Sequence, residues 1–354
     1  MIRQLTLLVI LLLQVLIFVA ARKPQVPCYF IFGDSLVDSG NNNGLNTSAK
    51  ANYLPYGIDF PLGATGRFTN GRTAADIIGQ LLGFTKFIPP YAAATNQEIS
   101  KGVNYGSGGA GIREETGRHV GDRISMDRQL LNHKTVLSRL STLQSNSTFT
   151  KKYLKKCIYL TNMGSNDYIN NYLIPSIYPT SNIYNSEQYA EVLVQQYSQQ
   201  LKTLYNLGAR KIVVFGLGQI GCTPAEIASF GKNGKPCVEW INDAVNIFND
   251  KLKFLVKEFN KKYSHSRFTF VNLTSISAPQ GGVAVPNNAP CCQVGQDGLC
   301  VPNSIPCPNR GLSVFYDAFH PTETANLVIA TRSYIAVSPN DASPYDISLL
   351  ARLK

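Results

Sequence analysis

Internal repeats and low-complexity linkers are both missing from this chain of 354 residues. It has no internal repeat at a period of about 20–50 residues, which argues against solenoid and propeller architectures. It also has no low-complexity linker that would separate two folding units. The length exceeds a typical domain of ~100–200 residues, but α/β chains often fold as one unit at this size. We therefore predict a single domain over residues 22–354.

Long hydrophobic runs are scarce, and the one at the N-terminus is short. Residues 5–19 are almost wholly apolar, whereas a membrane-spanning helix needs about 20 such residues. The run follows a positive start at Arg3 and ends at the small residues Ala20 and Ala21. These features are typical of a secretory signal peptide. We predict that residues 1–21 are removed and that the mature protein is secreted, with no stable membrane anchor.

The charge balance is basic, with a formal net charge of +11, but the basic residues form no stripe. Lysine pairs at 151–152, 155–156 and 261–262 are scattered, and no stacking aromatics are interleaved with them. The pattern therefore argues against nucleic-acid binding and favours solvated helix faces. A weak attraction to an acidic cell-wall polysaccharide remains an open expectation.

Histidine is missing near the cysteine-rich segment 291–307, which weakens a zinc interpretation. Cys291 and Cys292 are adjacent and lack the usual C-x₂-C spacing of zinc ligands. The even count of eight cysteines in a secreted chain favours disulfides, whose connectivity the sequence leaves open. Cys28 and Cys157 begin apolar runs, so buried free thiols are an alternative for these two.

Three N-x-S/T sequons agree with a secretory route. They begin at Asn46, Asn146 and Asn272, which are the predicted N-glycosylation sites. Short sequons also arise by chance, so their weight comes from their combination with the signal peptide.

Short apolar runs alternate with longer helical stretches along the mature chain. The predicted strands are 28–32, 157–161, 211–215 and 268–273. The predicted helices are 73–82, 127–140, 186–207, 238–263 and 322–335. Such alternation indicates βαβ units and a mostly parallel sheet covered on both faces. We predict a three-layer α/β/α fold with a flavodoxin-like sheet, in which the chemistry gathers at the carboxyl ends of the strands.

A serine follows the first predicted strand, and a carboxylate and an imidazole precede the last predicted helix. Ser35 is a poor nucleophile until a base takes its proton. His320 can accept that proton, while Asp317 fixes the tautomer and stabilises the imidazolium. Taken alone, Ser35 is more often a turn residue, and His320 can be a helix-start residue.

Acyl transfer also needs hydrogen-bond donors for the oxyanion. The glycine-rich loop 106–111 lets backbone N–H groups approach closely, and Asn166 offers a side-chain amide after strand 157–161. Each has a simpler alternative, a tight turn for the loop and an N-cap for Asn166. The ordered occurrence of all these blocks at strand ends and helix entrances favours one acyl-transfer site.

Two further sequence motifs, one present and one absent, bear on the choice of cofactor and of fold. Residues 216–221 fit G-x-G-x-x-G after a strand, but that fingerprint must open a helix, and Cys222-Thr223-Pro224 follows instead. The G-x-S-x-G elbow of α/β-hydrolases is absent around Ser35, which argues against that separate esterase fold. We predict neither a nucleotide nor any other cofactor.

The blocks resemble those of the plant GDSL esterase/lipase family within the SGNH hydrolases. The resemblance covers essentially the whole mature chain. The segments that carry it are Gly33-Asp34-Ser35-Leu36, Asn104-Tyr105-Gly106-Ser107-Gly108-Gly109, Gly164-Ser165-Asn166-Asp167 and Asp317-Ala318-Phe319-His320.

The resemblance implies a carboxylic ester hydrolase that acts outside the cell, in the cell wall or apoplast, on lipid or cell-wall acyl esters, with no metal or cofactor. The residues it implicates are Ser35 as nucleophile and oxyanion donor, His320 as base, Asp317 as its partner, and Gly108 (in preference to Gly109) and Asn166 as further oxyanion donors. Loops 49–72 and 169–184 are expected to shape the acyl pocket. Alternatives are an acyltransferase with the same triad and a non-catalytic wall-binding protein.

Overall fold

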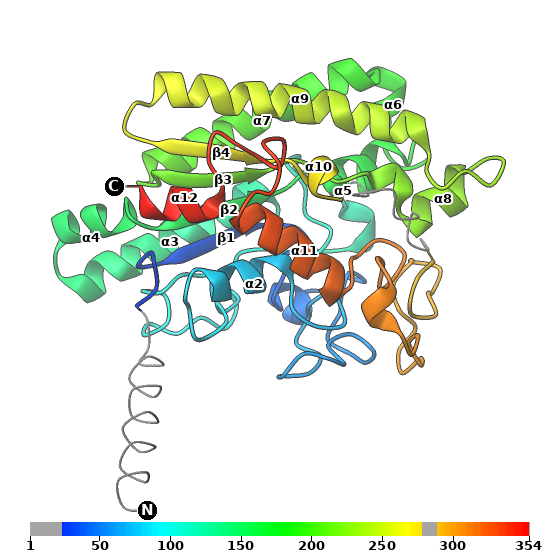
Figure 1. Ribbon diagram of the computed structural model, residues 1–354, viewed down its shortest axis with the longest axis horizontal. Helices are drawn as coiled ribbons and strands as arrows, with labels where there is room; N and C mark the ends of the chain where they lie inside the picture. Colours follow the sequence, from blue (N-terminus) through cyan, green and yellow to red (C-terminus); the bar gives the residue numbers. More distant parts are fainter. Residues whose placement is uncertain (1–22, 278–288, 354) are drawn as a thin grey trace, which may run out of the picture.

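A five-stranded sheet forms the centre of the computed structural model, which describes residues 23–277 and 289–353 (Figure 1). The strands lie in the order β1-β2-β3-β4-β5, with the first four parallel and β5 antiparallel to β4. Their bounds are Tyr29–Gly33 (β1), Ile158–Asn162 (β2), Lys211–Phe215 (β3), Arg267–Val271 (β4) and Ala342–Ser343 (β5).

A further segment extends this sheet beside β1. Asn104 forms an isolated parallel bridge with Ile31, so the chain visits the outer side of β1 before it returns to form β2. Counted with this bridge in chain order, the parallel members of the sheet run 2-1-3-4-5, which is the flavodoxin-like order that the sequence predicts, and the antiparallel β5 follows at the edge. The chain leaves β1 and β2 in opposite directions, and this opens a crevice at their carboxyl ends.

Helices cover both faces of the sheet, which confirms the predicted three-layer class. In Figure 1, α7 and α9 lie side by side on one face, and α2 and α11 lie together on the other. The helix bounds are Ala74–Leu81 (α2), Met126–Gln144 (α3), Ser147–Leu154 (α4), Ser165–Asp167 (α5), Thr180–Ile183 (α6), Ser186–Asn206 (α7), Pro224–Phe230 (α8), Glu239–Lys262 (α9), Leu273–Ser277 (α10), Glu323–Tyr334 (α11) and Ile347–Arg352 (α12).

Alternation along the strands divides the core into two apolar layers. Phe30 and Phe32 point to the layer that contains α3, α7 and α9. Tyr29 and Ile31 point to the layer that contains α2, α11 and α12. Every residue of β1, β2 and β3 is buried, as expected for parallel strands covered on both sides.

The predicted elements match the observed ones to within a few residues. Strand β3 has the predicted bounds, whereas β1 and β2 begin and end one residue later than predicted. Strand β4 ends before the predicted residue 273, because Leu273 already begins α10. The sequence missed the short strand β5 and the short helices α4, α5, α6, α8, α10 and α12, which are too short to show a period over an 11–18-residue window.

All eight cysteines are paired, as Cys28–Cys157, Cys222–Cys237, Cys291–Cys307 and Cys292–Cys300. The disulfide prediction is confirmed, and the alternative of free thiols at Cys28 and Cys157 is wrong. That pair joins the residues just before β1 and β2 and so ties the two strands that carry the crevice. Pairing also leaves no thiolate in the segment 291–307 for a zinc ion.

The predicted signal peptide, residues 1–21, lies outside the described residues. Within the described residues, none of the helices has the length and apolar character needed to cross a bilayer.

The Cys28–Cys157 bond is expected to contribute more stability than the short cysteine-rich loops. It spans 129 residues, against 8 for Cys292–Cys300. In the chain-entropy model, closing these loops in the unfolded state is worth about 5 and about 2.5 kcal/mol, respectively. Thermal unfolding of the Cys28→Ala/Cys157→Ala and Cys292→Ala/Cys300→Ala variants measures both losses. Equal losses would contradict the loop-length argument.

Candidate active site

Ser35 lies at the carboxyl end of β1, directly over the crevice between β1 and β2. The two strands approach closely there, since a Cβ on Gly33 would stand 2.5 Å from the Asn162 carbonyl oxygen. Glycine is therefore required at the turn that follows β1. The Asp34 N–H donates to the same Asn162 oxygen at 3.3 Å, which fixes the start of the loop that carries Ser35.

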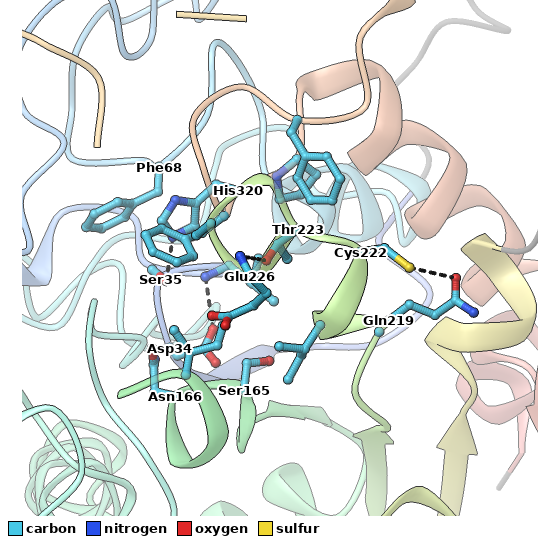
Figure 2. A pocket seen from close by; sticks show the side chains of 18 of the residues that line it. Asp34, Ser35, Phe68, Ser165, Asn166, Gln219, Cys222, Thr223, Glu226 and His320 are labelled. Carbon is cyan, nitrogen blue, oxygen red and sulfur yellow. Dashed lines mark hydrogen bonds between the residues drawn. The ribbon is translucent and has the colours of Figure 1, made fainter. Parts of the chain in front are cut away.

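The structure brings Ser35, His320 and Asp317 together, although 285 residues separate the serine from the histidine. The Ser35 Oγ lies 2.8 Å from the His320 Nε2 (Figure 2). The His320 Nδ1 lies 2.7 Å from the Asp317 Oδ2. Because Nδ1 donates to the carboxylate, Nε2 is the ring nitrogen that accepts the serine proton. This is the geometry in which a serine hydroxyl is activated by a general base.

The Asp317 carboxylate is fully buried and held by several donors. The backbone N–H groups of Phe319 and His320 donate to its Oδ1 at 2.8 and 2.7 Å. The Tyr56 hydroxyl donates to its Oδ2 at 2.6 Å. These bonds fix the carboxylate in position beside the His320 ring.

Tyr56 is a residue of the site that the sequence did not indicate. It also accepts a hydrogen bond from the Cys300 N–H at 3.0 Å, so it links Asp317 to the cysteine-rich segment. Burial, followed by the charge of Asp317, raises the pKa of Tyr56 well above its ordinary value, which keeps the phenol protonated as a donor. No local pattern marks a tyrosine 261 residues away in sequence as the partner of Asp317.

Three groups in the crevice each have an N–H that makes no hydrogen bond within the described residues. The backbone N–H groups of Ser35 and Gly109 have no hydrogen-bond acceptor within the described residues. The Asn166 amide donates one N–H to the Ala110 oxygen at 2.9 Å, and its own oxygen accepts from Asn170, so its orientation is set and its second N–H is free. Such groups can stabilise an oxyanion.

Gly108, the predicted donor of the glycine loop, is placed differently. Its N–H donates to the buried Asp38 Oδ2 at 3.1 Å and is therefore already engaged. Gly109, with φ of 77°, lines the cavity next to Ser35. The geometry thus favours Gly109 over Gly108 as the available backbone donor.

Asp38 holds the two loops of the crevice in register. Its Oδ1 accepts from the N–H groups of Gly40 and Asn41 at 2.7 and 2.8 Å, while its Oδ2 reaches the glycine loop at Gly108. The Asn42 side chain adds a bond to the Gly108 carbonyl at 2.9 Å. The polar run after Ser35 therefore serves to position the glycine loop, a role that its sequence pattern does not reveal.

A cavity of about 980 Å³ opens in front of Ser35 and His320. Much of its wall is apolar, including Leu36, Phe68, Leu173, Ile220, Phe319 and Ile329. The predicted loops 49–72 and 169–184 contribute only part of this wall. Segments 218–230 and 314–332 contribute more of it, because the tertiary fold brings them over the crevice.

The glycine motif 216–221 belongs to this wall. Gly218 and Ile220 line the cavity, and α8 begins only at Pro224, after the cystine at Cys222. The motif runs into a single 3₁₀ turn, Ile220–Cys222, whereas a pyrophosphate site requires an α-helix that opens directly from the glycine motif.

The predicted glycosylation sites differ in exposure. Asn46 and Asn146 are exposed, and Asn272 is partly buried. Asn146 and Asn272 each use the side-chain oxygen to accept a backbone N–H, from Phe149 and Ser275, respectively. Their nitrogens, which would carry a glycan, make no hydrogen bond within the described part of the chain.

The fold and the site define an α/β/α ester hydrolase, and comparison with known proteins agrees. Residues 29–332 match the family model described as GDSL-like Lipase/Acylhydrolase. Among Arabidopsis thaliana proteins, GDSL esterase/lipase At5g45670 is 47% identical over 99% of both chains. GDSL esterase/lipase At4g18970 is 48% identical over 95% of both, and At1g29660 is 48% identical over 95% of this chain and 94% of its own.

The chain therefore belongs to the GDSL-like lipase/acylhydrolase family, as the sequence blocks predict, and is a carboxylic ester hydrolase with an ester substrate.

Buried carboxyl groups gather around the site. Burial is the largest cause that raises the pKa of Asp34 and of Glu226 to about 7, and that of Asp38 and of Asp167 to about 6. Burial lowers the pKa of the core residue His133 to about 3. The structure thus favours uncharged forms at several of these positions.

These shifts predict lower stability at neutral than at mildly acidic pH. For each of the four carboxyls, stability is fully present below the unfolded pKa and is lost as pH rises through the folded pKa. His133 opposes this trend, because its stabilising effect is lost as pH falls, but it is one group against four. Each carboxyl contributes about 1.4 kcal/mol per pH unit while it titrates.

We expect the melting temperature to fall from about pH 5 to about pH 7, the interval in which these carboxyls titrate. Glu226→Gln removes one of them and should flatten the slope. Scanning calorimetry across this range measures both effects. A melting temperature that rises with pH through this interval would contradict the assignment of the buried carboxyls.

Proposed function

We propose that the protein is a secreted serine esterase that works through an acyl-enzyme on Ser35. The observation that supports this most is the hydrogen-bonded chain from the Ser35 Oγ through His320 to the buried Asp317, facing a large cavity with an apolar wall. The proposal includes a single domain over residues 22–354, released after cleavage of residues 1–21. Four disulfides and three sequons agree with a location outside the cell, in the wall or apoplast.

In the first half of the cycle, the Ser35 Oγ attacks the ester carbonyl carbon and its proton passes to the His320 Nε2. The carbonyl π electrons move to oxygen and form the oxyanion. When the tetrahedral adduct collapses, the bond to the alcohol oxygen breaks and His320 gives its proton to the leaving alcohol. Asp317 holds the imidazolium through Nδ1 during these steps.

In the second half, water loses a proton to His320 and attacks the acyl carbon. The second adduct collapses, the bond to the Ser35 Oγ breaks, and the proton returns to that oxygen as the free acid leaves. We assign the oxyanion contacts to the N–H groups of Ser35 and Gly109 and to the Asn166 amide. The apolar wall suits the acyl chain of a lipid or cell-wall ester.

Replacement of Ser35 tests the nucleophile. Ser35→Ala should lower kcat/KM for p-nitrophenyl esters, from acetate to palmitate, by about 10⁴-fold or more, and abolish labelling by a fluorophosphonate. The assay uses the full secreted protein, with circular dichroism to show that the variant is folded.

A folded wild-type protein that neither labels nor turns over any ester would overturn the proposal in favour of a non-catalytic binding protein. Labelling with turnover only when an acceptor alcohol is added would favour an acyltransferase instead.

The oxyanion assignment predicts a loss in kcat. Asn166→Ala should lower kcat about 10²–10³-fold with a small change in KM, because the amide acts on the charge of the transition state. Asn170→Ala is the matched control and should cost less, since the Asn170 side chain acts on the site through its bond to the Asn166 oxygen and has no second side-chain hydrogen bond within the described residues. Equal kcat values for Asn166→Ala and the wild type in steady-state assays would refute this role.

A further inference from the structure

Glu226 is a carboxyl in the wall of the active-site cavity for which the reaction has no use. It lies on α8, its residue is 5% exposed, and it lines the same cavity as Ser35. Figure 2 shows its side chain pointing into the cavity. Within the described residues, its carboxyl group has neither a hydrogen-bond donor nor an ion-pair partner. Its oxygens face the cavity, so a partner for them can come from a molecule that enters there.

A local structural role does not explain it. Thr223 and Glu226 have the spacing of a capping box, in which the glutamate returns to the N–H of the cap residue. Here only half of the box forms, because Thr223 accepts from the Glu226 N–H while its own N–H donates to Ile220. The complete box does form in α2 and α7. The Glu226 side chain turns into the cavity instead.

The basic residues that line the cavity, His119, His320 and Arg332, do not explain it either. The His119 Nδ1 is engaged by the Tyr178 hydroxyl at 3.0 Å. Arg332 donates to Asp341 at 2.6 and 3.1 Å and to the Ile276 carbonyl at 2.8 Å. The His320 ring is engaged by Asp317 and Ser35. Burial alone raises the pKa of Glu226 to about 7, with no charged neighbour contributing. The carboxyl group therefore stands ready for a partner that enters the cavity.

A neutral hydroxyl fits this position better than a cation. It can donate to the ionised carboxylate and can accept from the protonated acid, so it pairs with either form. An ammonium group pairs only with the ionised carboxylate, and it loses favourable hydration when it enters a cavity with an apolar wall.

We propose that Glu226 is a specificity-determining residue that hydrogen-bonds a hydroxyl group of the ester substrate. The proposal rests on the ester hydrolysis at Ser35 described above. It defines the substrate class as esters that carry a free hydroxyl, on either the acyl chain or the alcohol part, positioned inside the cavity. An ester without that hydroxyl leaves the carboxyl group unpaired and is disfavoured in the transition state.

Matched ester pairs test this. The first arm compares p-nitrophenyl octanoate, dodecanoate and hexadecanoate with their mid-chain and terminal hydroxy derivatives. The second arm compares monoacylglycerols with methyl esters of the same acids. The glycosylated, secreted wild type is assayed beside Glu226→Leu and Glu226→Gln, and active enzyme is counted by fluorophosphonate labelling. Glu239→Leu, which removes an exposed glutamate of α9 outside the cavity lining, is the matched control.

We expect the wild type to prefer the hydroxylated ester about tenfold or more in kcat/KM in one arm, which identifies the part that carries the hydroxyl. Glu226→Leu should remove the preference and improve turnover of the plain ester, because the unpaired carboxyl is gone. Glu226→Gln should keep part of the preference, and Glu239→Leu all of it. Thermal unfolding shows whether each variant is folded.

Ester cleavage with no preference in either arm, or a preference that Glu226→Leu leaves intact, overturns the role of Glu226 and leaves the esterase standing. A preference for aminoacyl over hydroxyacyl esters would show that Glu226 binds an ammonium group and not a hydroxyl, and this result also overturns the proposal. Absence of both labelling and turnover in the wild type overturns the esterase and this proposal together.

Discussion

The buried carboxylate of Asp317 is the point at which separate parts of the chain become one site. It collects donors from its own turn, from the His320 ring and from the Tyr56 hydroxyl. Tyr56 in turn accepts from Cys300, in the segment closed by two disulfides. An ionised group at zero exposure is tolerated only because its oxygens are satisfied in this way. The same bonds hold His320 in line with Ser35.

On the opposite side of the crevice, the positions of the backbone donors depend on polar side chains. Asp38 and Asn42 tie the glycine loop to the loop after β1, which leaves the Gly109 N–H free beside Ser35. Asn166 is oriented by Asn170 and Ala110 in the same manner. The hydrogen-bond donors of the site are thus in place before substrate enters, so little reorganisation is needed when charge develops.

This arrangement costs stability, because several carboxyl groups are taken out of water. Asp38 and Asp167 recover part of that cost through backbone N–H donors. Asp34 and Glu226 recover less. Within the described residues, the buried Asp34 Oδ2 has no partner, and burial is the cause that raises the pKa of Glu226, with no hydrogen bond to offset it. Polar groups left unpaired at a cavity are typical of positions retained for function rather than for folding.

Local sequence pattern was enough to predict the α/β class and the approximate helix and strand positions. It also indicated the candidate site residues, through four short sequence blocks, and disulfide formation, through the even number of cysteines. These depend on neighbouring residues, on short-range periodicity and on chemistry that a few adjacent side chains reveal. Several features depend on contacts between distant segments: the disulfide pairing, the short strand β5, Tyr56 behind Asp317, the choice between Gly108 and Gly109, and Glu226 in the cavity wall. Whether a backbone N–H is free to bind substrate depends on which groups pack against it. Whether a glutamate in the first turn of a helix caps that helix or points elsewhere depends on the space beside it. The tertiary structure decides these points because burial and partner geometry exist only after folding.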